Sequence, residues 1–466
     1  MCLLFRGGRR ALSSRLLCVW GKRAIEHGDH NRISWSRIQQ CWQNGNKGTD
    51  GAMASTKKHQ PTSYRLIGDT VVFGDPDEDT LAQIRRCSAP RETVGSVLCA
   101  DAHKGYSMPI GGVVAYEGLV SPSGVGFDIA CGNKAVRTEL HADDIRKDLP
   151  KIMDAIVDTI SFGLGRKNPN PIDHPLFDSP RWNVHPGVAA LKSLAREQLG
   201  TVGAGNHYVD LLEEVGTGRL WVAVHFGSRG FGHKTATGFL NLAANRPFDA
   251  PPRGENMDAP PTLLRTDTDL GQAYIEAMRL AGEYAYAGRD YVVDQVLKIL
   301  GARATFTVHN HHNFAWEEEH HGRKVWVIRK GATPNHPGQL SFVGGSMADI
   351  AVVLRGKDTP AARASLYSTV HGAGRIMSRT QAAGKWRRVG KRRIRVGGAI
   401  SPEAMQRKVA AYGVELRGGA PDEAPDVYRR LDEVLAAHAD TIEILYTLKP
   451  IGVAMAPPDI FDPYKD

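Results

Sequence analysis

Short apolar runs alternate with amphipathic stretches from Tyr64 onward, and no repeat of fixed period interrupts them. Apolar residues recur with the 3.6-residue period of a helix in five stretches: 142–161, with a break at Pro150, 187–199, 268–300, 402–412 and 424–438. Strands are predicted at four apolar or β-branched runs: 220–226, 304–309, 324–330 and 349–356. Because helices and strands do not alternate regularly, we expect an α+β fold rather than a doubly wound sheet. Five prolines in residues 247–266 predict a long surface loop.

The composition narrows the class of protein. At roughly 150 residues per domain, 466 residues leave room for about three domains, although one large domain fits equally. With 42% hydrophobic and 23% charged residues, the chain is neither disordered nor a disulfide scaffold. The six cysteines are expected to be reduced thiols, ligands or nucleophiles. No apolar run of about 18 residues predicts a membrane span, so we expect no membrane partner.

The net charge of +9 is concentrated at the start of the chain. Residues 1–52 hold nine Lys and Arg against three acids, a net charge of +6. An Arg-rich, acid-poor start with several leucines is typical of a transit peptide, which would target an organelle. Met53 opens a second plausible start, so residues 1–52 are equally well interpreted as an upstream extension. On that interpretation we expect a cytoplasmic protein, and in either case the fold begins after residue 52.

Five islands rich in glycine or histidine interrupt the pattern: DAHKGYSMPIGG (101–112), SGVGFDIACGN (123–133), GTVGAGNH (200–207), HFGSRGFGH (225–233) and HGAGRIMSR (371–379). Glycine permits positive φ and close approach of backbone N–H groups to an anion, so a glycine-flanked His or Asp suits a phosphate site near a metal. A single island of this kind is usually only a turn. Five such islands in one chain favour a binding site for phosphate and metal.

Several side chains have the spacing of metal ligands. Asp128 and Cys131 lie three residues apart, so both can face one point on a turn. His207 ends a glycine-rich turn, and His225 lies near the end of a predicted strand. The segment HNHHNFAWEEEHH (309–321) adds five histidines, which cannot all converge on one ion. Thiolate and imidazole suit Zn, Fe or Cu, and the added carboxylate leaves Mn open. The alternative for Cys131 alone is a small buried hydrophobe.

Two basic segments point to phosphate or nucleic acid. RKGAT (329–333) places Arg329 and Lys330 before a glycine, which suits phosphate oxygens or simply ends a strand. GKWRRVGKRRIRVGG (384–398) interleaves Trp386 with seven basic residues, the composition of a nucleic-acid groove with one stacking ring. A solvated surface is the alternative. The absence of HExxH and of a Ser-His-Asp order gives zincin and serine-hydrolase chemistry no support.

Taken in order, the islands resemble the RtcB family of RNA-splicing ligases. DIACG resembles its D-x-x-C-G motif, GAGNH its G-x-G-N-H, HFGSRGFGH its H-x-G-S-R-G-x-G-H, RKGAT its R-K-G-A-T and HGAGRIMSR its H-G-A-G-R. PDEAPDVYRRLDEV (421–434) resembles the family's EAPxAYKxxD, and the likeness covers roughly residues 64–455. The resemblance implies one large catalytic domain over 53–466, with several packed, mainly antiparallel sheets flanked by helices.

The resemblance also implies the roles of individual residues. Cys131 would bridge two Mn²⁺ ions, one completed by Asp128 and His207 and the other by His225 and His312, since HNFAWEE fits the family better there than at His309. His371 would be the nucleophile that takes up the nucleotide, with Arg229 near the phosphates. The implied nucleotide-binding residues are Asn206, Asp210, Lys330, Ser346, His371, Gly372, Gly374, Arg375 and Tyr428.

The implied activity is a ligase that joins RNA 3′-phosphate or 2′,3′-cyclic phosphate ends to 5′-hydroxyl ends with Mn²⁺ and GTP, in RNA repair or tRNA splicing. Three positions depart from the family: Asp210 replaces a Glu that reads guanine, Met455 replaces a terminal Lys, and Ile328 stands where His is frequent. A methionine cannot donate a charged hydrogen bond to guanine O6, so ATP stays open beside GTP. The alternatives are a metal-dependent phosphoesterase or nuclease on the same scaffold, and a non-catalytic RNA-binding protein.

Overall fold

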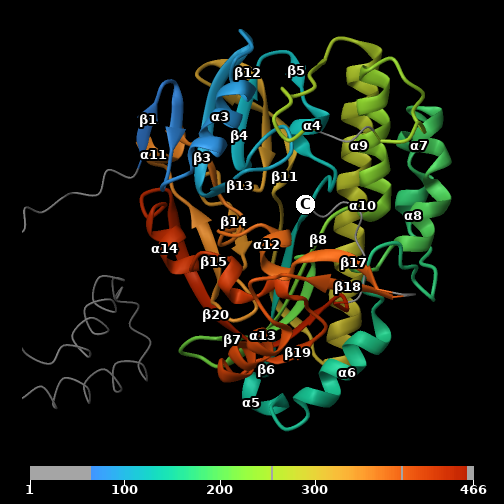
Figure 1. Ribbon diagram of the computed structural model, residues 1–466, viewed down its shortest axis with the longest axis vertical. Coiled ribbons are helices and arrows are strands. Elements are labelled where there is room, and N and C mark those ends of the chain that lie inside the picture. The colour runs from blue at the N-terminus through green and yellow to red at the C-terminus, as the bar shows by residue number, and fades with distance from the viewer. Residues whose placement is uncertain (1–63, 253–255, 390–391, 459–466) are drawn as a thin grey trace, which may run out of the picture. The chain divides into compact units, whose positions relative to one another are not determined.

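The computed structural model describes residues 64–252, 256–389 and 392–458, and the leader predicted at residues 1–52 lies outside them. Two sheets form the framework (Figure 1). The first is six-stranded, and in spatial order its strands are β1 (Arg65–Ile67), β2 (Thr70–Val72), β3 (Thr93–His103), β4 (Ile110–Tyr116), β12 (Arg323–Lys330) and β11 (Asn313–His320). Only β2 and β3 pair in parallel in this sheet.

The second sheet is eight-stranded and carries most of the ends that meet at the site. Its order is β10 (Ala304–His311), β6 (Gly132–His141), β8 (Arg219–Phe226), β7 (Tyr208–Glu214), β20 (Ile442–Met455), β15 (Ala351–Gly356) and β14 (Leu340–Val343), with β19 (Glu415–Arg417) parallel to β20. All other neighbours in it pair antiparallel. Three two-stranded sheets complete the strands: β13 (Ala332–Pro334) with β16 (Ser368–Val370), β17 (Lys385–Val389) with β18 (Arg392–Val396), and β5 (Leu119–Val120) with β9 (Leu264–Arg265).

Helices cover these sheets. The longest is α10 (Asp269–Leu300), which Thr268 caps at its start and Gly301, at positive φ, ends. Buried residues line it from Tyr274 to Val296, where it packs on β8 and on α9 (Arg229–Ala243), as Figure 1 shows. The others are α3 (Glu78–Cys87), α4 (Pro122–Val125), α5 (Ala142–Ile145), α6 (Leu149–Thr159), α7 (Pro186–Ala190), α8 (Lys192–Gln198), α11 (Pro360–Ala364), α12 (Arg379–Ala383), α13 (Pro402–Ala411) and α14 (Leu431–Ala436), with 3₁₀ turns at Pro175–Asp178, Pro180–Asn183, Pro421–Glu423 and Pro425–Val427.

The predicted α+β class of mainly antiparallel sheets is confirmed. The four predicted strands correspond to β8, β10, β12 and β15, and the break at Pro150 separates α5 from α6, because proline sits in the first turn of α6. Of 424–438 only the six residues of α14 are α-helical. None of the described helices is long and apolar enough to cross a bilayer.

Candidate functional site

Four neighbouring strands of the eight-stranded sheet bring the candidate metal ligands to one edge. Because β10, β6, β8 and β7 are antiparallel neighbours, the end of one lies beside the start of the next. Cys131 directly precedes β6, His207 directly precedes β7, His225 lies at the end of β8, and His312 follows β10. The pairings Gly132 with His311 and with Phe226 hold these ends in register.

The five side chains form two groups that share one thiol. Asp128, Cys131 and His207 make one, and Cys131, His225 and His312 the other, with ligand atoms within 4.8 Å of one another in each. The Cys131 Sγ lies 3.3 Å from His225 Nε2 and 3.7 Å from His207 Nε2, and the Asp128 Oδ2 lies 2.9 Å from His207 Nε2. His225 Nε2 is 3.3 Å from His312 Nε2. This donor set fits one or two transition-metal ions.

The neutral protonation state of His225 and His312 favours metal binding. His225 Nδ1 donates to the carbonyl of Asn206 at 2.8 Å, which leaves Nε2 as the acceptor that faces Cys131. Burial, reinforced by His207, lowers the pKa of His225 to about 3, and burial also holds the pKa of His312 well below its usual value. Both rings are therefore neutral at pH 7, the form that binds a metal.

The acid and the thiol respond differently to burial. Burial would raise the pKa of Asp128, but the charge of His207 and the hydrogen bonds from His207 and Cys131 outweigh it and lower that pKa overall. Burial and the Asp128 carboxylate raise the pKa of the Cys131 thiol well above its usual value. A thiol in this state binds a cation only by losing its proton, which the cation's charge promotes.

Glycines make room for the ligands. A Cβ on Gly203 would lie 2.0 Å from His207 Nδ1, and one on Gly227 would lie 2.3 Å from Asp128 Oδ1. Neither glycine has the positive φ that only glycine adopts readily. The GTVGAGNH and HFGSRGFGH islands therefore need these glycines because side chains pack onto them, rather than for a turn.

His371 lies beside this cluster and contacts the six-stranded sheet through Asp101. It follows β16, and its ring centroid is 4.9 Å from that of His312. The buried Asp101 of β3 accepts from His371 Nδ1 at 2.7 Å and from the His371 backbone N–H at 2.9 Å. Burial would raise the Asp101 pKa, but the charge and hydrogen bonds of His371 outweigh it and lower it. In the neutral ring the carboxylate holds the proton on Nδ1 and leaves the Nε2 lone pair available.

The other histidines of the 309–321 segment lie away from the cluster. His309 and His311 both contact the buried guanidinium of Arg289. His320 bonds to Glu318, and His321 occupies the turn after β11 at positive φ. Alternate residues of a strand point to opposite faces, so only one histidine of the series reaches Cys131.

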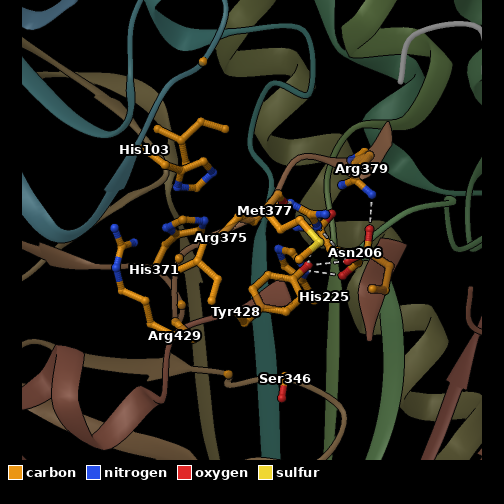
Figure 2. A pocket seen from close by; sticks show the side chains of 18 of the residues that line it. His103, Asn206, His225, Ser346, His371, Arg375, Met377, Arg379, Tyr428 and Arg429 are labelled. Carbon is orange, nitrogen blue, oxygen red and sulfur yellow. Dashed lines mark hydrogen bonds and ion pairs between the residues drawn. The ribbon is translucent and has the colours of Figure 1, made fainter. Parts of the chain in front are cut away.

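A cavity of about 840 Å³ opens onto Asp128, His225 and His371 (Figure 2). The side chains labelled around it come from both sheets, from the start of α12 and from the loops before β7, after β14, after β16 and before α14. Cys131, His207 and His312 are buried. All nine residues predicted for the nucleotide line this cavity: Asn206, Asp210, Lys330, Ser346, His371, Gly372, Gly374, Arg375 and Tyr428.

Two predicted phosphate contacts have protein partners. Lys330 lines the cavity, and its Nζ donates to the Tyr106 carbonyl at 2.5 Å. Arg229, at the start of α9, instead donates to Thr201 Oγ1 and to the Gly163 carbonyl, and it does not line the cavity. Its guanidinium supports the loop that carries His207 rather than facing the cavity.

Another part of the cavity combines the apolar side chains of β20 with Asp210 and Tyr208 of β7. Val453 and Met455 of β20 pair with Asp210 and Tyr208 of β7, and all four line the cavity. The Asp210 Oδ1 is buried and has no hydrogen-bond partner within the part of the chain that the structure describes. Burial, with no compensating charge, raises the Asp210 pKa well above its usual value. Burial therefore favours the protonated form of Asp210, in which the carboxyl group can both donate and accept a hydrogen bond.

A charged network holds the loop that carries Tyr428. Arg375 donates to the Tyr428 hydroxyl at 3.0 Å and to the Asp422 carbonyl at 2.7 Å. Glu423 accepts from Tyr428 and from Arg379, which also reaches Asp422. These contacts order the cavity wall that the HGAGR island and the 421–434 segment share.

The basic segment 384–398 forms the β17–β18 hairpin. Lys385, Arg387 and Arg388 are exposed on it. Trp386 is covered by the Arg395 guanidinium, 4.9 Å from its ring centroid, and Arg395 lies 3.5 Å from Asp422. The side chains of Lys391, Arg392 and Arg393 lie outside the described residues. The exposed face is therefore basic, and the indole is packed against arginine.

Several residues in the cavity lining or in contact with it were not singled out from the sequence. Asp101 and His103 belong to the DAHKGYS island, so a signal was present, but the partner of Asp101 lies 270 residues away. Arg379 and Arg429 also line the cavity; Arg379 ends the HGAGRIMSR island and Arg429 lies in the 421–434 segment, but neither was assigned a role from the sequence.

Fold and site define an α+β protein with a Cys/His/Asp cluster suited to metal ions beside a large polar cavity. The family model described as "tRNA-splicing ligase RtcB" matches residues 83–456. The chain is 31% identical to tRNA-splicing ligase RtcB of Thermococcus kodakarensis (77% of this chain, 87% of the relative) and 30% identical to RNA-splicing ligase RtcB of Escherichia coli K12 (75% and 87%). It is 29% identical to tRNA-splicing ligase RtcB of Pyrobaculum aerophilum (85% and 95%). The chain therefore belongs to the RtcB family, as its motifs predicted.

Proposed function

We propose that this protein is an RNA ligase that joins 3′-phosphate or 2′,3′-cyclic phosphate ends to 5′-hydroxyl ends, in RNA repair or tRNA splicing. The observation that carries the proposal is the placement of His371, whose Nδ1 is held by Asp101 while its ring packs on His312 of the cluster. A nucleophilic imidazole beside candidate metal ligands, in a cavity large enough for a nucleotide, suits attack on phosphorus.

Two Mn²⁺ ions are the proposed cofactors. Asp128, Cys131 and His207 would hold one, and Cys131, His225 and His312 the other. The Nε2 atoms of His207 and His225 both face the Cys131 Sγ, and His312 Nε2 faces His225 Nε2, so these ring nitrogens would be the ligand atoms. When bound, the ions neutralise charge on phosphate oxygens and on a leaving pyrophosphate.

His371 performs the first step. Its Nε2 attacks the α-phosphorus of a nucleoside triphosphate, pyrophosphate leaves, and Asp101 stabilises the positive charge that develops on the ring. The RNA 3′-phosphate then takes the nucleotide from His371, which forms an activated anhydride. Attack by the 5′-hydroxyl closes the phosphodiester and releases the nucleoside monophosphate.

The cavity lining provides the contacts for the nucleotide and RNA phosphates. Asn206, Lys330, Ser346 and Arg375 are the proposed polar partners, Gly372 and Gly374 allow close approach, and Tyr428 forms the wall. GTP is the nucleotide that the family likeness favours. Burial raises the Asp210 pKa and favours its protonated form, which offers one donor and one acceptor. These match two polar atoms on the edge of either purine, so we include ATP as a second nucleotide.

The test is transfer of label from α-labelled nucleoside triphosphates to the protein with Mn²⁺. We expect an acid-labile adduct with GTP or ATP that is absent from a His371→Gln variant. A wild-type protein that takes no label from any of the four triphosphates would rule out the ligase.

A metal-dependent phosphoesterase or nuclease is the second candidate. Asp210, whose Oδ1 has no hydrogen-bond partner among the described residues, and the apolar Met455 favour this candidate. Loss of the nucleotide site would leave the metal cluster and the basic hairpin in place. Phosphate release from cyclic-phosphate RNA without any adduct at His371 would support this candidate. For a non-catalytic RNA-binding protein, His371→Gln would keep full activity in a complementation assay.

A further inference from the structure

The face of α10 that packs on the eight-stranded sheet carries a buried cation. Arg289 lies among the buried residues of this helix, and none of its side chain is exposed. Figure 1 shows α10 beside β8, on which it packs. Burial lowers the Arg289 pKa to about 10, so the guanidinium is still cationic at pH 7. Its hydrogen-bond partners among the described residues are all uncharged: two carbonyl oxygens and two imidazole nitrogens.

One nitrogen of this guanidinium bridges two segments of the metal cluster. Arg289 Nη1 donates to the Ala130 carbonyl at 3.0 Å and to the Phe226 carbonyl at 2.7 Å. Ala130 directly precedes Cys131, and Phe226 directly follows His225. The two carbonyls therefore belong to the backbone next to the two candidate ligands whose Sγ and Nε2 atoms lie 3.3 Å apart.

The other donors of Arg289 hold the guanidinium in place. Its Nε donates to His309 Nε2 at 2.8 Å, and its Nη2 donates to His311 Nδ1 at 3.1 Å. Both rings belong to β10, which neighbours β6 on the side away from β8. The planar, rigid fork of an arginine donates in several fixed directions at once, which the single nitrogen of a lysine cannot do. The two imidazoles therefore fix the point at which Nη1 meets the carbonyls.

The backbone at Ala130 depends on this contact. Its φ is 60°, in the left-handed region, which is strained for a residue with a side chain. Its N–H donates to the Asn313 carbonyl at 2.7 Å, and its carbonyl accepts from Arg289. Hydrogen bonds on both sides of the residue hold it in this conformation. Because Cys131 follows directly, the direction of its side chain depends on the conformation of Ala130.

We propose that Arg289 is a positioning residue that sets the distance between the Cys131 thiol and the His225 imidazole, and with it the site of the ion that they share with His312. The inference rests on the metal cluster of the proposed function. Arg289 contacts none of these three side chains directly and acts through the two carbonyls. If it only filled the core, loss of the fork would lower stability without weakening the bond between metal and thiolate.

The experiment uses Co²⁺ as the probe metal, because it accepts the same nitrogen and sulfur ligands and its bond to a thiolate gives a charge-transfer absorption band. The metal-free protein is titrated with Co²⁺, and Cys131→Ala, which should lack the band, assigns it. Arg289→Lys keeps the charge without the fork. We expect its Kd for the thiolate-bound Co²⁺ to rise about tenfold and its band at saturation to weaken. His311→Ala is the matched control, since it keeps both carbonyl contacts of Nη1 and should keep the band.

A second variant separates positioning from support of the core. A glycine adopts the left-handed conformation without strain, so Ala130→Gly combined with Arg289→Lys should recover part of the lost Co²⁺ affinity. Circular dichroism and thermal unfolding without metal show whether each variant is folded. Wild-type affinity and band in folded Arg289→Lys would overturn the inference. A double variant that binds Co²⁺ no better than Arg289→Lys, or a chain that folds in neither background, would also overturn it.

The wild-type protein distinguishes failure of the proposed function from failure of this inference. If wild type binds no Co²⁺ through Cys131, the proposed metal cluster and the role of Arg289 fail together. If wild type shows the band and transfers label to His371, while Arg289→Lys binds Co²⁺ equally well, only the role of Arg289 is contradicted.

Discussion

Among the described residues, Cys131 alone belongs to both groups of candidate metal ligands. Its Sγ lies within 3.7 Å of the Nε2 atoms of His207 and His225. Asp128, His207, His225 and His312 each belong to one group. Loss of the thiol should therefore affect both ions, and loss of one of the other side chains should affect mainly one.

This difference is measurable by elemental analysis. We expect about two Mn per chain in wild type, close to none in Cys131→Ala, and about one in His312→Ala. In His312→Ala the site formed by Asp128, Cys131 and His207 keeps all three of its ligands. His311→Ala is a control, because His311 contacts Arg289 instead of the cluster. An unchanged metal count in Cys131→Ala would contradict the shared-ligand arrangement.

Asp210 makes a prediction about stability and pH. Its pKa is raised by burial in the folded protein, so the folded state binds a proton more tightly than the unfolded state does, and stability falls as pH rises above about 4. Asp210→Asn removes this dependence and should be more stable than wild type by about 1 kcal/mol at pH 8. Thermal unfolding of both proteins at pH 5 and pH 8 checks this, and a difference that shrinks toward pH 8 would contradict it.

At the scale of elements, the sequence predicted the helices and strands whose apolar residues follow a regular pattern. The amphipathic period over 268–300 gave α10 to within one residue, and LWVAVHF gave β8. The HFGSRGFGH island did not predict α9, because its three glycines and its polar residues obscure a helix whose buried face packs on α10 and α4. Strand β20 was missed for a similar reason, since it contains Pro450 and Gly452 at a bulge.

The site itself could be predicted only in part. The islands marked Asp128, Cys131, His207, His225 and His371 as candidates, but spacing along the chain cannot show that antiparallel neighbours bring their ends together. Resemblance supplied the selection of His312 among five histidines, and the structure places that ring in the cluster through the alternation of β10 and the residues after it. The contacts of Asp101 and Arg429 depend on tertiary packing alone.

The junction between β8 and α9 offers a test of the close approach at Gly227. Its φ is not in the left-handed region, so Gly227→Ala acts through the added methyl group, which would meet the Asp128 carboxylate. We expect loss of about one Mn per chain and a destabilisation of about 1–3 kcal/mol. Gly95→Ala is the control, since its methyl would make only an ordinary contact with Leu366 at 3.5 Å. Full metal content in Gly227→Ala would contradict the geometry.

The β17–β18 hairpin makes a prediction about RNA affinity. Lys385 and Arg387 are exposed on it, and each phosphate contact that they make should release a counterion. The double alanine variant should raise the Kd for RNA about tenfold at low salt and reduce the slope of log K against log salt by about 1 to 2. The exposed pair Arg323 and Lys324 at the start of β12 serves as the control. Equal losses in the control pair would show that only net charge matters.

At the scale of the whole molecule, we propose that the catalytic domain begins after residue 52. The matching family model starts at residue 83, and the first described strand starts at Arg65. A chain that starts at Met53 should transfer nucleotide to His371 at a rate within about twofold of the full chain, because deletions outside a domain's packed core have small effects. The intact mass of the mature protein shows which form exists. A large loss of activity on truncation would assign residues 1–52 a role in the fold.

The position of β20 has a consequence for synthesis of the protein. This strand is among the last described residues, yet it lies between β7 and β15 in the eight-stranded sheet. The partner of Asp101, His371, also lies 270 residues further along the chain. A chain whose synthesis has not reached β20 lacks an inner strand of the framework, so we expect it to be inactive. A premature stop codon even twenty codons from the end would remove part of that strand, so we expect such alleles to yield degraded protein rather than a shortened enzyme.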